Sequence, residues 1–325
     1  LQQQGINPAR YILIPIEDSV NNAQWVGEIR MVSPRWHTVY TRNFKNASVF
    51  KAHQRAFGYD IIQVDEQKPE MDYFALIAQE LKGSTLASAQ IKVLFPESAL
   101  TKMEEMGILS RINTIYNHAR DEEARKDSID RILFLGGMRP PTGVWAEGNG
   151  HLGALKQCLE KARQVNIVIG SAQRSDDERC PLRAGERLEI VRYALLANGV
   201  AASSFYTIPV RDIDSNATYA PRLESLVPRF TKIVSGNGLT LDLFTLYEQV
   251  TLTRTEVHGS QVPLSATYVR KTIYDQLRGK RKEQIAETIH DIERALEGAL
   301  DPTLREIFGA LKVYDRMHSI ANRIE

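Results

Sequence analysis

Cysteine is scarce in this sequence of 325 residues, with only Cys158 and Cys180 present. Two cysteines cannot form a disulfide framework, and neither has the spacing of a metal site, so we expect reduced thiols. Long apolar runs are also absent, and none reaches the roughly 18–20 residues that a membrane span needs. No segment resembles a signal peptide. These absences predict a cytoplasmic protein that has no membrane partner.

An excess of charge of one sign is lacking too. Lysine and arginine together number 41, aspartate and glutamate 40, and the formal net charge is +1. This balance gives no electrostatic basis for binding nucleic acid. The remaining composition, 43% hydrophobic and 25% charged, is that of a globular protein, and the length leaves room for two domains with hydrophobic cores.

An internal repeat organises the chain. Leu1–Phe50 aligns without a gap with Leu195–Phe244 at a constant offset of 194, and eleven of the fifty positions are identical. Conservative pairs such as Trp25 and Tyr219 keep the hydrophobic pattern. A repeat of this length predicts two copies of one structural unit. The second copy is preceded by about 64 residues, 131–194, that the first lacks, so any chemistry in them is present once.

Strands and helices alternate through the second copy. Apolar runs predict strands at Arg131–Gly137, Val165–Gly170, Tyr206–Val210 and Lys232–Ser235. Helical spacing predicts helices at Gly150–Gln164, Ala184–Asn198 and Ala217–Leu226. This alternation predicts an α/β fold with an open, mostly parallel sheet that binds ligands at the carboxyl ends of its strands. From Leu264 onward we expect helices, the last of them opened by Pro302.

The first copy gives the same kind of pattern over fewer residues. We expect strands at Tyr11–Ile14 and Thr38–Tyr40, and helices from Asn22 to about Val32 and over Met103–Arg125. The charged segment Arg120–Asp130 is the expected inter-domain linker, or else a solvated helix end. The predicted domains are therefore residues 1–130 and 131–325.

The first candidate site is the turn after the strand that opens the second copy. Gly136 ends the strand, and Gly150 and His151 begin a helix. Glycines let backbone amides approach an anion, and a helix N-terminus favours negative charge. This pattern predicts phosphate binding at Gly136, Gly150 and His151, although a capping or packing role would give the same residues.

A second candidate is the small-residue turn Gly170–Gln173, which follows the next strand and precedes Arg183 and Arg187. These arginines lie one helical turn apart and could hold a phosphate, or could pair with glutamate on a solvated helix face.

A third candidate is the helix start at Ser265–Arg270. Ser265 and Thr267 offer hydroxyl groups and free backbone amides, and Arg270 returns to the same end one turn later. This combination predicts a cradle for a polyphosphate. The histidines other than His151 are scattered, so we predict no metal site made by the protein itself.

Five segments in register resemble the HxGH-type nucleotidyltransferases, most specifically the archaeal-type nicotinamide mononucleotide (NMN) adenylyltransferases. The segments are Ile169–Gln173, Ala184–Arg187, Ile208–Asp212 with Asn216, Val234–Asn237 and Ser265–Arg270. In the first copy, similar segments are Ile14–Asp18, Asn22–Trp25 and Thr41–Asn43. The resemblance implies two Rossmann-like nucleotidyltransferase units with mostly parallel sheets, of which the first is degenerate and incomplete at its N-terminal side.

The resemblance also implies a reaction and a set of ligands. The reaction is adenylyl transfer from ATP to NMN, which gives NAD and pyrophosphate, with Mg²⁺ bound to ATP. By resemblance, His151 and Arg270 are catalytic and hold the ATP phosphates with Gly136, Gly150, Ser265 and Thr267. Asn237 would lie near the adenosine. The mononucleotide side would be formed by Ser171, Arg187, Asn216 and Tyr219, where Tyr219 replaces the family's usual tryptophan.

This sequence departs from the family pattern at the first turn. Gly148 stands where the family has its first histidine, Gly137 replaces the usual arginine, and Thr142–Glu147 enlarges the turn. Thr142 or Arg139 could compensate for the lost phosphate contacts.

The first copy departs further. It has Ala87, Ala89 and Lys92 where the second has Ser265, Thr267 and Arg270, which predicts a non-catalytic unit.

Two alternatives to NAD synthesis stay open. One is a catalytically weakened nucleotide-binding protein that regulates or supports an assembly, and the other is an adenylyltransferase for another phosphorylated acceptor. We also expect a homo-oligomer. Because the first copy begins at the equivalent of a helix end, we expect the natural polypeptide to extend upstream by about one β-α-β-α segment, or another subunit to supply it.

Overall fold

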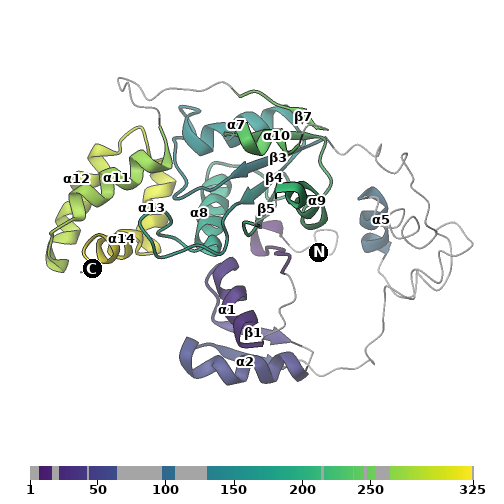
Figure 1. Cartoon of the computed structure of the whole chain (residues 1–325), viewed down its shortest axis with the longest axis horizontal. Helices are drawn as coiled ribbons and strands as arrows, with labels where there is room; N and C mark the ends of the chain where they lie inside the picture. Colours follow the sequence, from purple (N-terminus) through teal and green to yellow (C-terminus); the bar gives the residue numbers. More distant parts are fainter. Residues whose placement is uncertain are drawn as a thin grey trace, which may run out of the picture.

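The computed structural model describes residues 7–16, 22–41, 44–63, 97–106, 130–213, 216–236, 238–244, 247–252 and 264–323 (Figure 1). The first copy's 87–92 segment, residues 120–129 of the expected linker, and Asn237 lie outside these residues.

A five-stranded parallel sheet forms the centre of the second unit, in the order β5-β4-β3-β6-β7. Its strands are β3 (Arg131–Gly136), β4 (Gln164–Ile169), β5 (Phe205–Pro209), β6 (Lys232–Ser235) and β7 (Glu248–Gln249). The four strands predicted from the sequence are confirmed to within one residue at each end. The predicted α/β class is confirmed as well. The strand order reverses between β3 and β6, where such sheets open a ligand crevice at their carboxyl ends.

Helices cover both faces of this sheet. Ile132 and Phe134 of β3 pack in one core cluster with α7 (Gly150–Lys161) and α8 (Ala184–Ala197). Leu133 and Leu135 pack on the opposite face with α9 (Asn216–Leu226) and with Phe244, which follows α10 (Gly238–Asp242). Successive side chains of a strand point to opposite faces, so a strand covered on both sides reads as one continuous apolar run.

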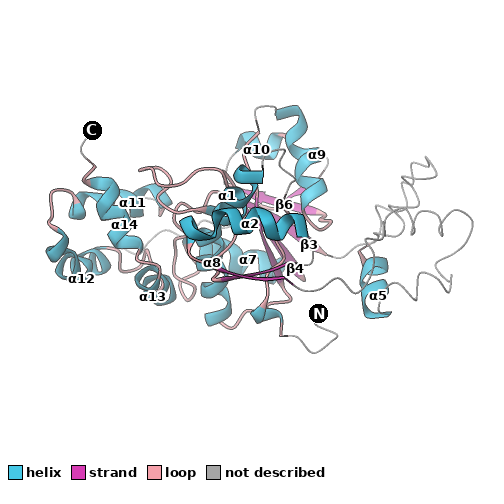
Figure 2. Cartoon of the chain, turned by 90° about the horizontal axis from the view of Figure 1, so that it is seen from below, coloured by secondary structure: helices cyan, strands magenta, loops and turns pink. Residues whose placement is uncertain are grey.

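Helices after residue 264 gather at one end of the sheet around their own core (Figure 2). They are α11 (Ala266–Leu277), the 3₁₀ turn η4 (Lys282–Gln284), α12 (Ile285–Ala295), α13 (Pro302–Ala310) and α14 (Val313–Ala321). Pro302 does open a helix, but the prediction that this helix is the last was wrong. Lys312 adopts a left-handed conformation (φ 52°), which ends the preceding turn and lets α14 begin separately.

Both cysteines are free and buried, and burial raises the pKa of the Cys158 thiol to about 12. Within the described ranges, no helix is both long and apolar enough to cross a membrane.

The first unit is smaller and contains a two-stranded parallel sheet. Its elements are η2 (Pro8–Arg10), α1 (Asn22–Val32), β1 (Thr38–Thr41), α2 (Phe44–Phe57), β2 (Asp60–Gln63) and α5 (Glu97–Glu105). At the offset of 194, α1 and β1 coincide end to end with α9 and β6, and α2 begins where α10 begins.

Ring contacts recur at the same offset. The equivalent pairs are Trp25–Phe50 with Tyr219–Phe244, and Trp36–Phe50 with Phe230–Phe244. Their centroid distances are 5.6 and 6.3 Å in the first case and 6.2 and 6.3 Å in the second. Since contacts as well as residue types repeat, they support our proposal that the two units are copies.

The strand predicted at Tyr11–Ile14 was wrong. These residues are not assigned to a strand and pair with none of the described strands, and Ile12 and Ile14 pack against the core cluster beside α7 and α8. Arg192 of α8 donates to the Tyr11 carbonyl at 2.9 Å. The segment lies against a helical layer, whose backbone groups are already bonded, so a side chain satisfies its carbonyl in place of a neighbouring strand.

The first unit docks on the second mainly through α1 and α8 (Figure 1). The approach is so close that a Cβ on Gly185 would lie 1.8 Å from the Ser33 carbonyl oxygen. At the edge of this contact, Arg211 pairs with Glu28 at 2.8 Å.

Candidate nucleotide site

The enlarged turn after β3 folds back onto the start of α7. A Cβ on Gly143 would lie 2.1 Å from the Asn149 carbonyl oxygen, and one on Gly150 would lie 2.7 Å from the Gly143 Cα. Both glycines have positive φ, 107° and 59°. Only glycine fits this close approach, which brings the two ends of the turn together and leaves the N-terminus of α7 at the carboxyl edge of the sheet, behind Gly136.

The turn is anchored to the segment between α12 and α13. Asp301 accepts the Trp145 amide at 2.9 Å and donates its own amide to the Gly143 carbonyl at 2.8 Å. Asn149 donates to the Gly298 carbonyl at 3.0 Å. The segment between α12 and α13 therefore holds the residues by which the turn exceeds the family pattern.

His151 faces a different residue from the one that the sequence pattern implied. Gly148, at the position of the family's first histidine, has a positive φ of 66° and open space around its missing Cβ. Thr142, 1% exposed, instead lies beside the His151 ring, with its Oγ1 2.8 Å from Nδ1. Burial lowers the pKa of His151 to about 4, so the imidazole is neutral at neutral pH.

The N-terminus of α11 meets that of α7. A Cβ on Gly150 would lie 2.9 Å from Leu264 Cδ2, which places the residue before Ser265 against the start of α7. Ser265 caps α11 by accepting the Tyr268 amide at 3.1 Å. Two helix N-termini at one place present free amides and positive dipole ends to an anion.

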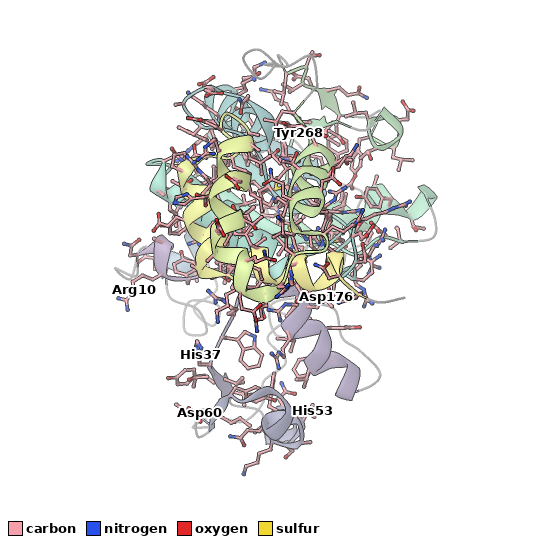
Figure 3. All side chains as sticks on the ribbon, turned by 90° about the vertical axis from the view of Figure 1, so that its left-hand side faces the viewer. Arg10, His37, His53, Asp60, Asp176 and Tyr268 are labelled. Atoms are coloured by element: carbon pink, nitrogen blue, oxygen red, sulfur yellow. The ribbon has the colours of Figure 1, made fainter. Side chains whose placement is uncertain are left out.

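Arg270 closes this corner. Its guanidinium donates to the Thr267 hydroxyl at 3.1 Å and to the Arg139 carbonyl. Burial lowers the pKa of Arg270, and the positive charge of Arg139 contributes. The structure thus brings together the predicted phosphate-binding residues on β3, α7 and α11. In Figure 3, Tyr268 on α11 lies in the upper part of the view, and His53 and Asp60 of the first unit lie near its lower end.

The predicted mononucleotide side lies at the carboxyl ends of β4 and β5. Ser171, with φ of 50°, donates its hydroxyl to Asp212 Oδ1 at 2.9 Å and accepts from Arg139. Burial, and then the negative charge of Asp212, raise the pKa of the Tyr219 phenol, whose ring packs against Phe244. Asn216 opens α9 nearby, and its side chain lies outside the described part.

Arg187 has no surface of its own to offer a ligand, because it is fully buried. Its guanidinium donates to the carbonyls of Gly137 (2.7 Å), Gly170 (2.8 Å) and Ser171 (3.0 Å). Burial lowers its pKa to about 10. The geometry therefore gives Arg187 a positioning role: it ties together the turns that follow β3 and β4. Its predicted direct contact with the mononucleotide is not favoured.

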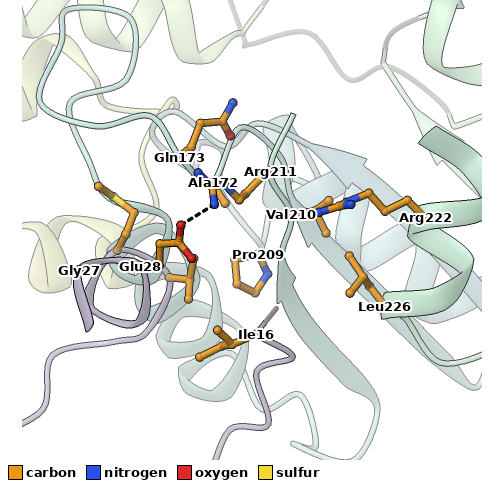
Figure 4. Close-up of a pocket in the computed structure, with 12 residues that line it drawn as sticks. Ile16, Gly27, Glu28, Ala172, Gln173, Pro209, Val210, Arg211, Arg222 and Leu226 are labelled. Atoms are coloured by element: carbon orange, nitrogen blue, oxygen red, sulfur yellow. Dashed lines mark hydrogen bonds and ion pairs between the residues drawn. The ribbon is translucent and has the colours of Figure 1, made fainter. Parts of the chain in front are cut away.

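A cavity of about 380 Å³ lies beside this network, between α1 and the end of β5 (Figure 4). The second unit contributes Gln173, which exchanges two hydrogen bonds with Asp212 (3.1 and 3.0 Å), and the first contributes Glu28. Three lining pairs are equivalent in the repeat: Ile16 with Val210, Glu28 with Arg222, and Val32 with Leu226. Both units therefore line this cavity partly with residues at equivalent positions of the repeat.

The sequence pattern gave no role to Asp212, and it offered Arg139 and Thr142 only as alternatives. Asp212 links Ser171 to Gln173, Arg139 links Ser171 to Arg270, and Thr142 bonds His151. Asp212 does follow a predicted strand at its carboxyl end, and that position was the available signal.

Comparison with known proteins gives a consistent result for the family of this chain. No family model matches the chain. Three curated relatives are named nicotinamide-nucleotide adenylyltransferase. The Thermococcus sibiricus protein is 36% identical over 114 residues, 35% of this chain and 58% of its own length. The Methanococcus vannielii protein is 33% identical over 150 residues (46% and 83%), and that of Pyrobaculum aerophilum 32% over 173 residues (53% and 91%).

The extent of these matches varies. The chain spans just under three fifths, 58% and 59%, of the Thermococcus sibiricus and Pyrococcus furiosus relatives. Among solved structures, a bifunctional NMN adenylyltransferase/ADP ribose pyrophosphatase from Francisella tularensis, complexed with AMP and a manganese ion, is similar with a TM-score of 0.40 and 16% identity. That alignment covers 59% of this chain and 52% of that one. On the identity and coverage of the curated relatives, the chain belongs to the nicotinamide-nucleotide adenylyltransferase family.

Proposed function

We propose that the second unit transfers the adenylyl group of ATP to NMN, giving NAD and pyrophosphate. The observation that carries this proposal is the convergence of the α7 and α11 N-termini with Arg270, which Arg139 links to the Ser171–Asp212 pair. One group suits a polyphosphate, and the other lies where an acceptor would approach it.

In this reaction a phosphate oxygen of NMN attacks the α-phosphorus of ATP. The new P–O bond forms as the bond to the β-phosphate oxygen breaks, and pyrophosphate leaves with that electron pair. Little proton transfer is needed, so positioning and charge neutralisation supply the catalysis. In our proposal Arg270 and the helix N-termini stabilise the negative charge of the ATP phosphates, and His151 donates a hydrogen bond from a ring N–H to a phosphate oxygen.

Mg²⁺ is proposed to enter with ATP and to neutralise part of its charge. Among the described residues, no three His, Cys, Asp or Glu side chains gather into a metal site. We propose that this ion takes its ligands from phosphate oxygens and water, as Mg²⁺ commonly does.

The first unit is proposed to be non-catalytic, because the segment equivalent to Ser265–Arg270 carries alanine and lysine at the key positions. A homo-oligomeric assembly and a cytoplasmic location stay predictions from the sequence.

The test is to incubate the protein with Mg²⁺, NMN and ATP labelled at the α-phosphorus. We expect label in NAD and an equal amount of pyrophosphate. Binding of ATP without any NAD would favour the nucleotide-binding alternative. Product formed only with another phosphorylated acceptor, such as nicotinate mononucleotide, would show that NMN is not the substrate.

A further inference from the structure

The enlarged turn delivers one buried hydroxyl to the ring of His151. Thr142 is 1% exposed, and its Oγ1 lies 2.8 Å from His151 Nδ1. Its carbonyl accepts the Leu152 amide at 3.1 Å, so both its backbone and its side chain are bonded to the first turn of α7. Thr142 is therefore fixed relative to the imidazole.

The charge state of the ring decides what this contact can do. Burial lowers the pKa of His151 to about 4, so at neutral pH the ring carries one N–H, on either Nδ1 or Nε2. A neutral imidazole can donate to a phosphate only from the nitrogen that holds the proton. The nitrogen bonded to Thr142 is Nδ1, so Nε2 is the nitrogen left for a ligand.

The direction of the Thr142 bond follows from its burial. Within the described residues, His151 Nδ1 is the only hydrogen-bond partner of Thr142 Oγ1. If the hydroxyl oxygen accepted a hydrogen bond from an Nδ1–H group, the hydroxyl's own O–H would be buried without an acceptor, which is costly. If it donates to the Nδ1 lone pair, the buried O–H is satisfied and the ring proton resides on Nε2.

We propose that Thr142 is a positioning residue that holds His151 in the Nε2–H tautomer, so that Nε2 donates to a phosphate oxygen of the bound nucleotide. This inference rests on the proposed function for the identity of the ligand, but the tautomer itself is a property of the free protein. It gives the residues inserted into the turn a role, because they connect Thr142 to the start of α7.

Two variants and a control separate this role from simple packing. Thr142→Val keeps the shape and removes the hydroxyl, whereas Thr142→Ser keeps the hydroxyl. Thr207→Val is the matched control, because Thr207 is 3% exposed, lies on β5 and has no partner for its hydroxyl among the described residues.

The direct measurement is the ¹⁵N NMR spectrum of the histidine ring nitrogens in the ligand-free protein at neutral pH. We expect a protonated Nε2 and an unprotonated Nδ1 for His151 in the wild type, Thr142→Ser and Thr207→Val. We expect a mixture of tautomers in Thr142→Val. A protonated Nδ1 in the wild type, or an unchanged ratio in Thr142→Val, would overturn the proposal.

The kinetic measurement is the KM for ATP and for NMN in the same variants. Thr142→Val should raise the KM for ATP roughly 3- to 10-fold, the range of one ordinary hydrogen bond, and leave that for NMN unchanged. Thr142→Ser should restore it. If the wild type makes no NAD, the proposed function fails while the NMR result still decides the tautomer. If Thr142→Val does not fold, the wild-type and Thr142→Ser spectra decide it.

Discussion

Gly150 lies directly against Leu264, so that a Cβ on the glycine would be 2.9 Å from Leu264 Cδ2. The contact joins the first residue of α7 to the residue before the cap of α11, although 114 positions separate them in the sequence. It sets the distance between two helix N-termini, and the proposed phosphate site depends on that distance.

Gly150→Ala tests this contact. The new Cβ would meet Gly143 and Leu264, and the residue would keep a positive φ of 59°. Gly148→Ala is the control, since its φ is also positive, 66°, but its Cβ would meet nothing within 4 Å. Both variants carry the cost of a left-handed alanine, so Gly150→Ala should lose about 1–3 kcal/mol more in the free energy of urea unfolding. Equal losses would show that the two helix ends are not in contact.

His151 predicts a specific pH dependence of stability. Burial lowers its pKa from 6.5 to about 4 in the folded protein. Below pH 6.5 the unfolded chain takes up a proton that the folded protein does not bind until about pH 4, so folding stability falls as pH falls through this window. The loss attributable to this group is about 3 kcal/mol. Urea unfolding between pH 7.5 and 4.5 should show a shallower decline in His151→Gln, and parallel declines in both proteins would contradict the burial of a neutral imidazole.

Tyr219 is expected to recognise the acceptor. Tyr219→Ala should raise the KM for NMN and leave calorimetric ATP binding nearly intact, because Tyr219 belongs to the proposed mononucleotide side, where burial and the Asp212 charge raise the pKa of its phenol. Tyr219→Phe keeps the ring and its contact with Phe244, and should remain close to the wild type. A collapse of ATP binding with an unchanged requirement for NMN would mean that the two ends of the site have been exchanged.

The docking of the two units depends on Gly185. A Cβ there would lie 1.8 Å from the Ser33 carbonyl oxygen, which is backbone and cannot rotate away. Gly185→Ala should therefore loosen α1 from α8, seen as faster hydrogen exchange in α1. Arg35→Ala, which removes an exposed pair with Glu189, should change exchange much less, since such pairs contribute about 0–1 kcal/mol. Unchanged exchange in Gly185→Ala would place α1 elsewhere.

The sheet and most helices could be predicted because their information is local. The apolar Ile132–Leu135 run indicates a strand that is buried on both faces. The repeat predicts the same elements at equivalent positions, and α1 and β1 do match α9 and β6. The same holds for the helix starts at Gly150 and Ser265, which are marked by their own glycine and hydroxyl residues.

What could not be predicted depends on contacts between segments far apart in the chain. Sequence spacing placed Gly148 at the position of the family's first histidine. Spacing alone cannot show that the enlarged turn folds back and leaves Thr142 beside His151. Arg187 looked available to a ligand, because nothing local indicates that its donors bond carbonyls at two strand ends. The Tyr11–Ile14 segment has strand composition, but whether it pairs depends on its neighbour, which here is α8.

The central claim is that Arg270 and the two helix N-termini hold the phosphates of ATP. Calorimetric titration of Mg²⁺–ATP into the wild type, Arg270→Ala and Arg278→Ala tests it most directly. Arg278 is the control, because it lies at the other end of α11 in an exposed pair with Glu178. The account predicts roughly 10- to 150-fold weaker binding in Arg270→Ala, the range of a charge-assisted hydrogen bond, and unchanged binding in Arg278→Ala. Equal affinity of Arg270→Ala and the wild type would contradict it.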